Sequence, residues 1–170
     1  MRPCAYDRHE LLEEQWLVTP AVPVEDYIDQ FGNHAWRLVA LAGMLRVYYD
    51  ALVATPPTPD FIFPDLPQTS VEQLPYDLSS YTLPSRYCES DLFADDAWAL
   101  FGAIPGGWAR VQAICAWIAA QIIYSGGGTA QISGWQAYQQ RRGVCRDFAH
   151  IAISFCRALN IPARYVAGYL

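Results

Sequence analysis

The stretch Arg142-Gly143-Val144-Cys145-Arg146-Asp147-Phe148-Ala149-His150 decides how the rest of the chain is interpreted. An apolar run continues from it to Leu159, and Asn160 and Pro162 follow that run. Glycine, asparagine and proline commonly mark helix ends, so the pattern predicts about four turns of helix between Gly143 and Asn160. Cys145 is therefore expected at or near the N-terminus of this helix.

A cysteine at a helix start lies in an electrostatic environment that favours its anion. The first N–H groups have no intrahelical acceptor and the helix dipole is positive at this end, so both stabilise a thiolate. The positive charges of Arg141, Arg142 and Arg146 act in the same direction. Asp147 acts against them. On balance the sequence predicts a lowered pKa for the Cys145 thiol, and a buried core cysteine is the competing interpretation.

Together with the segment from Arg157 to Tyr169, this stretch resembles the nucleophile segment of bacterial transglutaminase-like proteins. The resemblance implies an α+β, papain-like cysteine protease or transglutaminase core in which Cys145 attacks an amide carbonyl and forms a thioester. It also implies a first core strand over Arg164–Leu170. In that family a histidine and an aspartate on later strands complete the site. The sequence stops at Leu170, so the catalytic domain is expected to be truncated.

His150 is not expected to replace the family's histidine. Its position, five residues after Cys145, places it ~140° away around the helix and ~7.5 Å along it. A general base must come within ~3 Å of the group it deprotonates. We therefore interpret His150 as a structural residue. His9 and His34 lie in the N-terminal region and match no catalytic position.

The chain before this core divides by composition. Residues 1–54 are predicted to form a partial N-terminal β region, with a polar lead-in over residues 1–14 and then antiparallel hairpins. The turn Asp29-Gln30-Phe31-Gly32-Asn33 also resembles one in the β domain that precedes many transglutaminase-like cores. Strand-like runs rich in β-branched and aromatic residues occur at 16–18, 27–28, 34–41 and 45–49.

Residues 55–84 are rich in proline and are predicted to be a mostly extended crossing segment. Its apolar side chains are expected to pack on the core: Phe61, Ile62, Phe63 and Leu66. Residues 85–170 are then the N-terminal part of the catalytic domain. Helices are expected over 92–101, capped by Ser90 or Asp91, over 108–124 with Cys115 in the core, and over 135–141 after a Ser133 cap.

Other residues are candidates for the site around Cys145. Gln139 precedes it at the spacing of the oxyanion-stabilising glutamine of papain-like proteases, with a solvated helix face as the alternative. Trp135 and Tyr124 are aromatic candidates for the cleft wall, with core packing as the alternative. Arg142 and Arg146 are the candidates to support the thiolate. The glycine-rich run 125–129 is expected to be a loop rather than a phosphate loop, because no G-K-[ST] follows it.

Composition excludes several classes of partner. A formal net charge of -6 argues against nucleic acid and anionic membranes. The sequence has no apolar run of the ~20 residues needed to span a bilayer and no secretory start, which predicts a cytoplasmic protein. The five cysteines show no C-x-x-C spacing, so neither a metal site nor a disulfide framework is expected. No cofactor is implied.

The sequence therefore predicts a thiol acyltransferase or hydrolase acting on a glutamine or peptide amide of a protein or peptide substrate. Transglutaminase, deamidase and protease outcomes stay open. Because the histidine and aspartate partners are expected beyond Leu170, these 170 residues alone are expected to be inactive. The alternative function is a non-catalytic fragment or interaction module on the same fold. A redox-sensing cysteine and self-association through exposed sheet edges are further hypotheses.

Overall fold

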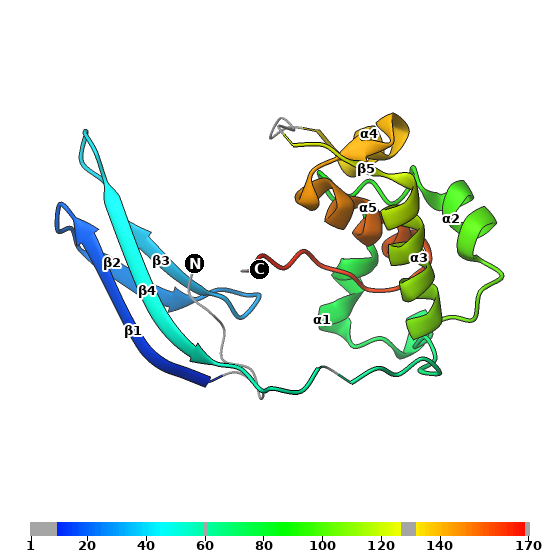
Figure 1. Ribbon diagram of the computed structural model, residues 1–170, viewed down its shortest axis with the longest axis horizontal. Coiled ribbons are helices and arrows are strands. Elements are labelled where there is room, and N and C mark those ends of the chain that lie inside the picture. Colours follow the sequence, from blue (N-terminus) through cyan, green and yellow to red (C-terminus); the bar gives the residue numbers. More distant parts are fainter. Residues whose placement is uncertain (1–9, 60, 127–131, 169–170) are drawn as a thin grey trace. The chain divides into compact units, whose positions relative to one another are not determined.

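The computed structural model describes residues 10–59, 61–126 and 132–168. The chain forms two compact units, a β unit that ends at Phe61 and a helical unit that comprises Ile62–Ala167. Figure 1 shows long paired strands in the first and a cluster of helices in the second. The combination confirms the predicted α+β class.

The β unit consists of two antiparallel ladders. Strand β1 (Glu10–Thr19) pairs with β4 (Arg46–Ala54), and β2 (Val24–Ile28) pairs with β3 (His34–Leu38). The antiparallel pairing is as predicted, but only β2–β3 is a hairpin, since β1 and β4 pair across the segment that contains β2 and β3. The expectation of a polar lead-in to residue 14 is wrong from Glu10 onward, because β1 begins there. Its charged side chains are compatible with a strand since that stretch of β1 lies largely in solvent.

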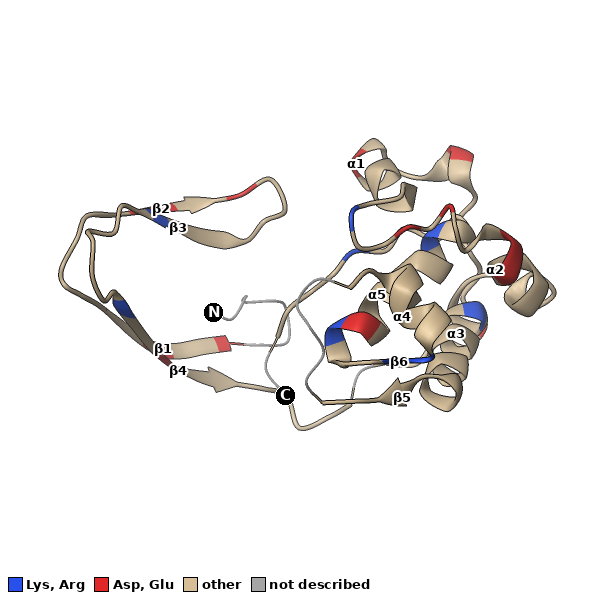
Figure 2. Cartoon of the chain, turned by 90° about the horizontal axis from the view of Figure 1, so that it is seen from above, with Lys and Arg blue, Asp and Glu red and all other residues tan. Residues whose placement is uncertain are grey.

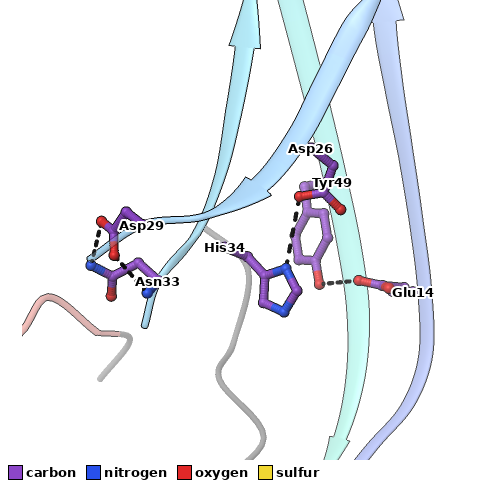
Figure 3. Close-up of polar contacts among 6 residues, drawn as sticks. All are labelled: Glu14, Asp26, Asp29, Asn33, His34 and Tyr49. Carbon is purple, nitrogen blue, oxygen red and sulfur yellow. Dashed lines mark hydrogen bonds and ion pairs between the residues drawn. The ribbon is translucent and has the colours of Figure 1, made fainter. Parts of the chain in front are cut away.

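The turn between β2 and β3 is held by one carboxylate. Asp29 Oδ1 accepts hydrogen bonds from the backbone N–H groups of Phe31 at 2.8 Å and Asn33 at 2.9 Å. Asp29 Oδ2 accepts a third from the Asn33 side chain at 3.0 Å, as Figure 3 shows. In the same view His34 Nδ1 lies 3.7 Å from an Asp26 carboxylate oxygen. A side chain that satisfies local N–H groups is the usual reason for aspartate at such a turn.

The helical unit contains the helices that the sequence predicts, with altered ends. These are α2 (Ala94–Phe101), α3 (Trp108–Gln121), α4 (Gly134–Gln140) and α5 (Cys145–Ala158). A short strand β5 (Ile123–Tyr124) runs parallel to β6 (Arg142–Gly143). The helix predicted over 108–124 is too long. The Ile123 N–H donates to the carbonyl of Arg141 at 2.8 Å, so at this point the chain belongs to the β5–β6 pair and no longer to the helix.

Capping was predicted correctly for one helix and wrongly for another. Ser133 caps α4, and its hydroxyl accepts from the Gln136 N–H while Gln136 Oε1 accepts from the Ser133 N–H. The N-cap of α2 is Phe93, without a side-chain hydrogen bond, and neither Ser90 nor Asp91 caps it. Instead, acidic residues occupy the first turn of α2, as the red colour in Figure 2 shows. Their negative charges are stabilised by the positive end of the helix dipole.

An aromatic cluster forms the core of the helical unit. The Phe155 side chain on α5 is fully buried, with four other rings within 4.8–5.6 Å between centroids: Phe93, Phe101, Trp117 and Tyr138. Ile151 and Leu159 on α5 are also fully buried, as its predicted apolar arc requires. The prediction for Cys115 is wrong: it is exposed, because Ile114 and Ile118 occupy the buried face of α3.

The crossing segment is more structured than predicted. Short helical turns cover Val71–Gln73 (η1), Tyr76–Ser79 (α1) and Ser80–Thr82 (η2). The four apolar side chains expected to pack on the core remain more than half exposed: Phe61, Ile62, Phe63 and Leu66. The crossing segment is attached to the helices by Gln68 instead. Its side-chain amide donates to the Leu159 carbonyl at 2.9 Å and accepts from Arg110 at 3.0 Å.

The strand predicted over 164–170 is absent from residues 164–168, which have no regular secondary structure, and residues 169–170 lie outside the described range. A strand needs a neighbour to pair with, and in the ranges described here the segment is held by other groups. The Ala163 N–H donates to the Tyr81 carbonyl at 3.1 Å. Within those same ranges, no helix is both long and apolar enough to cross a membrane.

Candidate active site around Cys145

Cys145 is the first residue of α5, at the helix start that the sequence predicts, and it is exposed rather than buried in the core. Strand β6 leads into the helix and is held by β5, since the Ser125 N–H donates to the Gly143 carbonyl at 2.9 Å. The first N–H groups of a helix have no intrahelical acceptor. The structure thus presents a thiol next to backbone donors that can bind negative charge.

One carboxylate fixes the turn that precedes the thiol. The Val144 N–H donates to Asp147 Oδ2 at 2.9 Å, and the Asp147 N–H donates back to the Val144 carbonyl at 2.8 Å. Gly143 leaves room for this side chain: a Cβ there would lie 2.7 Å from the Asp147 Cβ, closer than real side chains approach. From the sequence alone, Asp147 is an ordinary helix-start residue. Its spacing from Val144, the N3 position of a capping box, was the signal for the larger role.

The three arginines predicted to support a thiolate are in different environments. Arg146 Nε lies 3.6 Å from Asp147 Oδ1, so its charge compensates the buried carboxylate. Arg142 is exposed on β6. Arg141 packs over two rings, with its guanidinium carbon 4.9 Å from the Trp117 centroid and 4.4 Å from the Tyr138 centroid. Arg141 thus contributes to packing through cation–π contacts.

The three residues proposed to line the cleft or bind the oxyanion also lie in different environments. Tyr124 is paired with Gly143 across β5 and β6, is 65% exposed, and has its ring 6.2 Å from Phe148 on α5. It therefore lies beside the nucleophile segment. The Trp135 ring packs 5.2 Å from Phe93 and belongs to the border of the core. Gln139 is exposed on α4.

His150 lies between two tyrosines. Its ring stacks on Tyr87 with 5.5 Å between centroids and 7° between planes, and Tyr165 lies 5.6 Å away on a tilted plane. It is only 7% exposed, and burial lowers its pKa; Asp147 opposes this shift and Arg146 adds to it. Among the described residues, His150 Nδ1 has no hydrogen-bond partner. This environment fits the structural role predicted for it. His9 lies outside the described residues.

Arg157 is a structural residue that the sequence did not reveal. It is buried, and its guanidinium donates to the Leu83 carbonyl at 2.9 Å, the Ser85 hydroxyl at 3.0 Å and the Ala163 carbonyl at 2.9 Å. It fastens the segments before and after the helices to α5. In the described part of the chain, no group of three or more His, Cys, Asp or Glu side chains is arranged to hold a metal ion. The glycine-rich loop lies outside that part from residue 127 to 131.

Comparisons with known proteins agree with this geometry. Residues 102–170 match the model of the transglutaminase-like superfamily. A crystal structure of a candidate cysteine protease from Cytophaga hutchinsonii superimposes with a TM-score of 0.81 at 32% sequence identity, over 95% of this chain and 57% of that one. An uncharacterized protein from Mycobacterium leprae is 44% identical over 61 residues, which are 35% of this chain and 22% of that protein.

The chain thus spans little more than half of the solved relative and about a fifth of the curated one. The matched family region begins at the end of α2 and includes α5 with Cys145 at its start. Sequence, fold and family therefore agree on the part of the chain that carries the exposed thiol. Residues 102–170 are thus transglutaminase-like, and the chain has a papain-like α+β fold that matches the solved candidate cysteine protease.

Proposed function

We propose that Cys145 is the nucleophile of an acyl-transfer or hydrolytic reaction at an amide carbonyl of a protein or peptide. The observation that carries the proposal is the exposed thiol at the first position of α5, inside the region that matches the family. Structural cysteines are usually buried and inert, as Cys156 is here, where burial raises the thiol pKa to about 12. Cys145, in contrast, is exposed.

The proposed reaction has two steps. The Cys145 sulfur attacks the carbonyl carbon, an S–C bond forms, and the C–N bond breaks so that ammonia or an amine leaves with a proton from a general acid. Water or a second amine then attacks the thioester and releases the thiol. The Cys145 backbone N–H, at a helix start, is the candidate donor to the oxyanion that forms in each step.

The general acid is the part of this mechanism that the described residues do not supply. His150 is held between Tyr87 and Tyr165 and is buried. We therefore propose that these 170 residues alone do not turn over amides. The same observation supports a second candidate function, a non-catalytic interaction module built on the transglutaminase-like fold.

The decisive experiment is alkylation of the folded protein by iodoacetamide near neutral pH, with each cysteine followed by peptide mass spectrometry. Cys115 is the matched control, since it is also exposed but lies in the middle of α3. Cys88 and Cys156 are buried and report unfolding. If Cys145 is activated, it should react at least about tenfold faster than Cys115.

Equal rates at Cys145 and Cys115 would remove the nucleophile from the proposal and favour the interaction module. Rapid labelling of Cys88 or Cys156 would mean that the protein had opened during the measurement, and the rates would then be taken at lower temperature. The redox hypothesis needs a resolving thiol, and oxidation followed by mapping of disulfides tests it on the same peptides.

A further inference from the structure

The Asp147 side chain is fully buried, which is unusual for a carboxylate. Its Oδ2 accepts the Val144 N–H at 2.9 Å, and its Oδ1 lies 3.6 Å from Arg146 Nε. Within the described residues, Oδ1 has no hydrogen-bond partner. A carboxylate that is removed from water costs stability, and here one hydrogen bond and the charge of Arg146 offset that cost. Helix capping alone is achieved as well by an exposed serine or aspartate.

The contacts of Asp147 converge on the residue before the nucleophile. Val144 and Asp147 exchange two hydrogen bonds, 2.9 Å and 2.8 Å long, which bracket Cys145. Gly143 adjoins the same carboxylate and is held on its other side by Ser125, whose N–H donates to the Gly143 carbonyl at 2.9 Å. The Val144 carbonyl, which shares a planar peptide with the Cys145 N–H, accepts from the backbone N–H groups of Asp147 and Phe148, and the Asp147 carboxylate holds the preceding peptide through the Val144 N–H. The side-chain and backbone bonds together fix both peptide planes that flank Val144, and with them the direction of the Cys145 N–H.

We infer that Asp147 is a positioning residue that orients the Val144–Cys145 peptide, so that the Cys145 N–H is aimed at the oxyanion formed when the thiol attacks a carbonyl. Gly143 is the second part of this device, since any side chain there displaces the carboxylate. The inference rests on the proposed function, because an oriented oxyanion donor matters only if Cys145 is a nucleophile.

Two reagents separate the orientation of the N–H from the reactivity of the sulfur. With p-nitrophenyl acetate, the sulfur adds to the ester carbonyl, a tetrahedral oxyanion forms, and p-nitrophenolate leaves to give an acetyl thioester; the thiol proton goes to buffer. With iodoacetamide, the sulfur displaces iodide from a saturated carbon, and no oxyanion forms. Accessibility and charge of the sulfur affect both rates. The ratio of acetylation to alkylation at Cys145 therefore reports the oxyanion donor.

The expected results differ between two substitutions at one position. Asp147→Ala removes the acceptor for the Val144 N–H, so the Cys145 N–H is aimed less well, and the ratio should fall about tenfold, which is less than the about 10²–10³ that complete loss of an oxyanion donor costs. Asp147→Asn keeps an acceptor oxygen while it removes the charge. The ratio in this variant should stay within about threefold of the wild-type value if the hydrogen bond, rather than the charge, positions the peptide.

Gly143→Ala tests the same device without a change of charge. It should lower the ratio by displacing Asp147, and the double variant Gly143→Ala/Asp147→Ala should be no worse than the more impaired single variant, because both changes break one contact. Ser154→Ala is the control for general destabilisation. Its hydroxyl donates to the His150 carbonyl at 2.7 Å, two turns further along α5, so its loss should leave the ratio unchanged.

Labelling of Cys88 and Cys156 shows in each variant whether the fold is intact. If Asp147→Ala fails to fold, Gly143→Ala decides the question alone. A wild-type ratio in every folded variant of Asp147 or Gly143 would overturn the inference while the proposed function stands. If neither reagent modifies Cys145 in the wild-type protein, the proposed function and the inference both fail.

Discussion

The two units of this protein bury their side chains to very different extents. In the helical unit, Phe155 of α5 is surrounded by Phe93 and by rings from α2, α3 and α4. Phe93, Ile114, Ile151 and Leu159 are also fully buried. In the described part of the β unit, Val18 is the only buried hydrophobic residue. Burial of apolar surface is the main favourable contribution to folding. The comparison suggests that the helical unit determines its own structure, whereas the β unit depends on backbone pairing.

The strongest test of this contrast removes one ring from each unit. Phe155→Ala should lower the free energy of unfolding by about 3–5 kcal/mol, because it leaves a large cavity amid four other rings. Trp16→Ala should cost about 1 kcal/mol, since Trp16 is 49% exposed and contacts Trp36 at 4.7 Å between centroids. Urea unfolding followed by the helical circular dichroism signal measures both. Similar losses would contradict the contrast.

A second test compares an arginine from each unit. Arg157→Met should cost about 1–3 kcal/mol, because it leaves the partly buried Leu83 and Ala163 carbonyls without their donor. Arg37→Met should change stability by less than about 1 kcal/mol, since its pair with Glu25 at 3.4 Å is exposed. The same urea titrations decide. A large effect at Arg37 would show that the β unit depends on its surface charges.

The helices were predictable because their signals are local. The periodic apolar residues of α5 and the Ser133–Gln136 capping box of α4 are each contained in one short segment. The position of Cys145 follows from the same signals, together with the family resemblance. The glycine before the segment was enough to predict the helix start, whereas the exposure of the thiol was left open against a buried core cysteine.

The structural features that were not predicted from the sequence depend on contacts between separate parts of the chain. Tyr124 leaves the helical pattern because β6, far along the chain, pairs with β5. Arg157 is buried because three acceptors from two segments converge on it: Leu83 and Ser85 before the helices, and Ala163 after α5. Cys115 is exposed although its neighbours in α3 are apolar, since the packing of Ile114 and Ile118 decides the orientation of the helix. Hydropathy along one segment contains none of this information.

Protonation of His150 gives a smaller, pH-dependent test. Burial lowers its pKa in the folded protein, with Asp147 opposing and Arg146 assisting the shift. Between this folded pKa and the unfolded value of about 6.5, only the unfolded chain binds the proton. The stabilising effect of neutral His150 is therefore fully present above about pH 6.5 and is lost as the pH falls through the folded pKa.

The variant His150→Phe keeps a ring between Tyr87 and Tyr165 but cannot titrate. We expect the stability of the wild-type protein to decline relative to this variant as the pH falls below about 6.5 and through the lowered folded pKa, by about 1.4 kcal/mol for each unit by which the two pKa values differ. Chemical unfolding at several pH values measures the difference. Parallel pH profiles for the two proteins would show that His150 does not contribute to acid sensitivity.

The smallest expected effect concerns the surface of the β unit. We propose that this unit self-associates weakly, because its ladders have unpaired outer edges and carry many exposed apolar side chains, among them Leu12, Leu17, Ile28, Tyr48 and Leu52. Sedimentation velocity should show an average mass that rises with concentration. Leu17→Glu in β1 should weaken the association. A strict monomer over a wide concentration range would contradict it.

The attachment made by Gln68 has a consequence for the order of folding. Its bond to the Leu159 carbonyl joins residues 91 positions apart, whereas the contacts within α3 and α5 are local. Closing so long a loop has an entropic cost that is recovered only after the helices have packed. The crossing segment is therefore expected to dock after the transition state for folding. Substitutions at Gln68 should shorten the lifetime of the native state without slowing its formation.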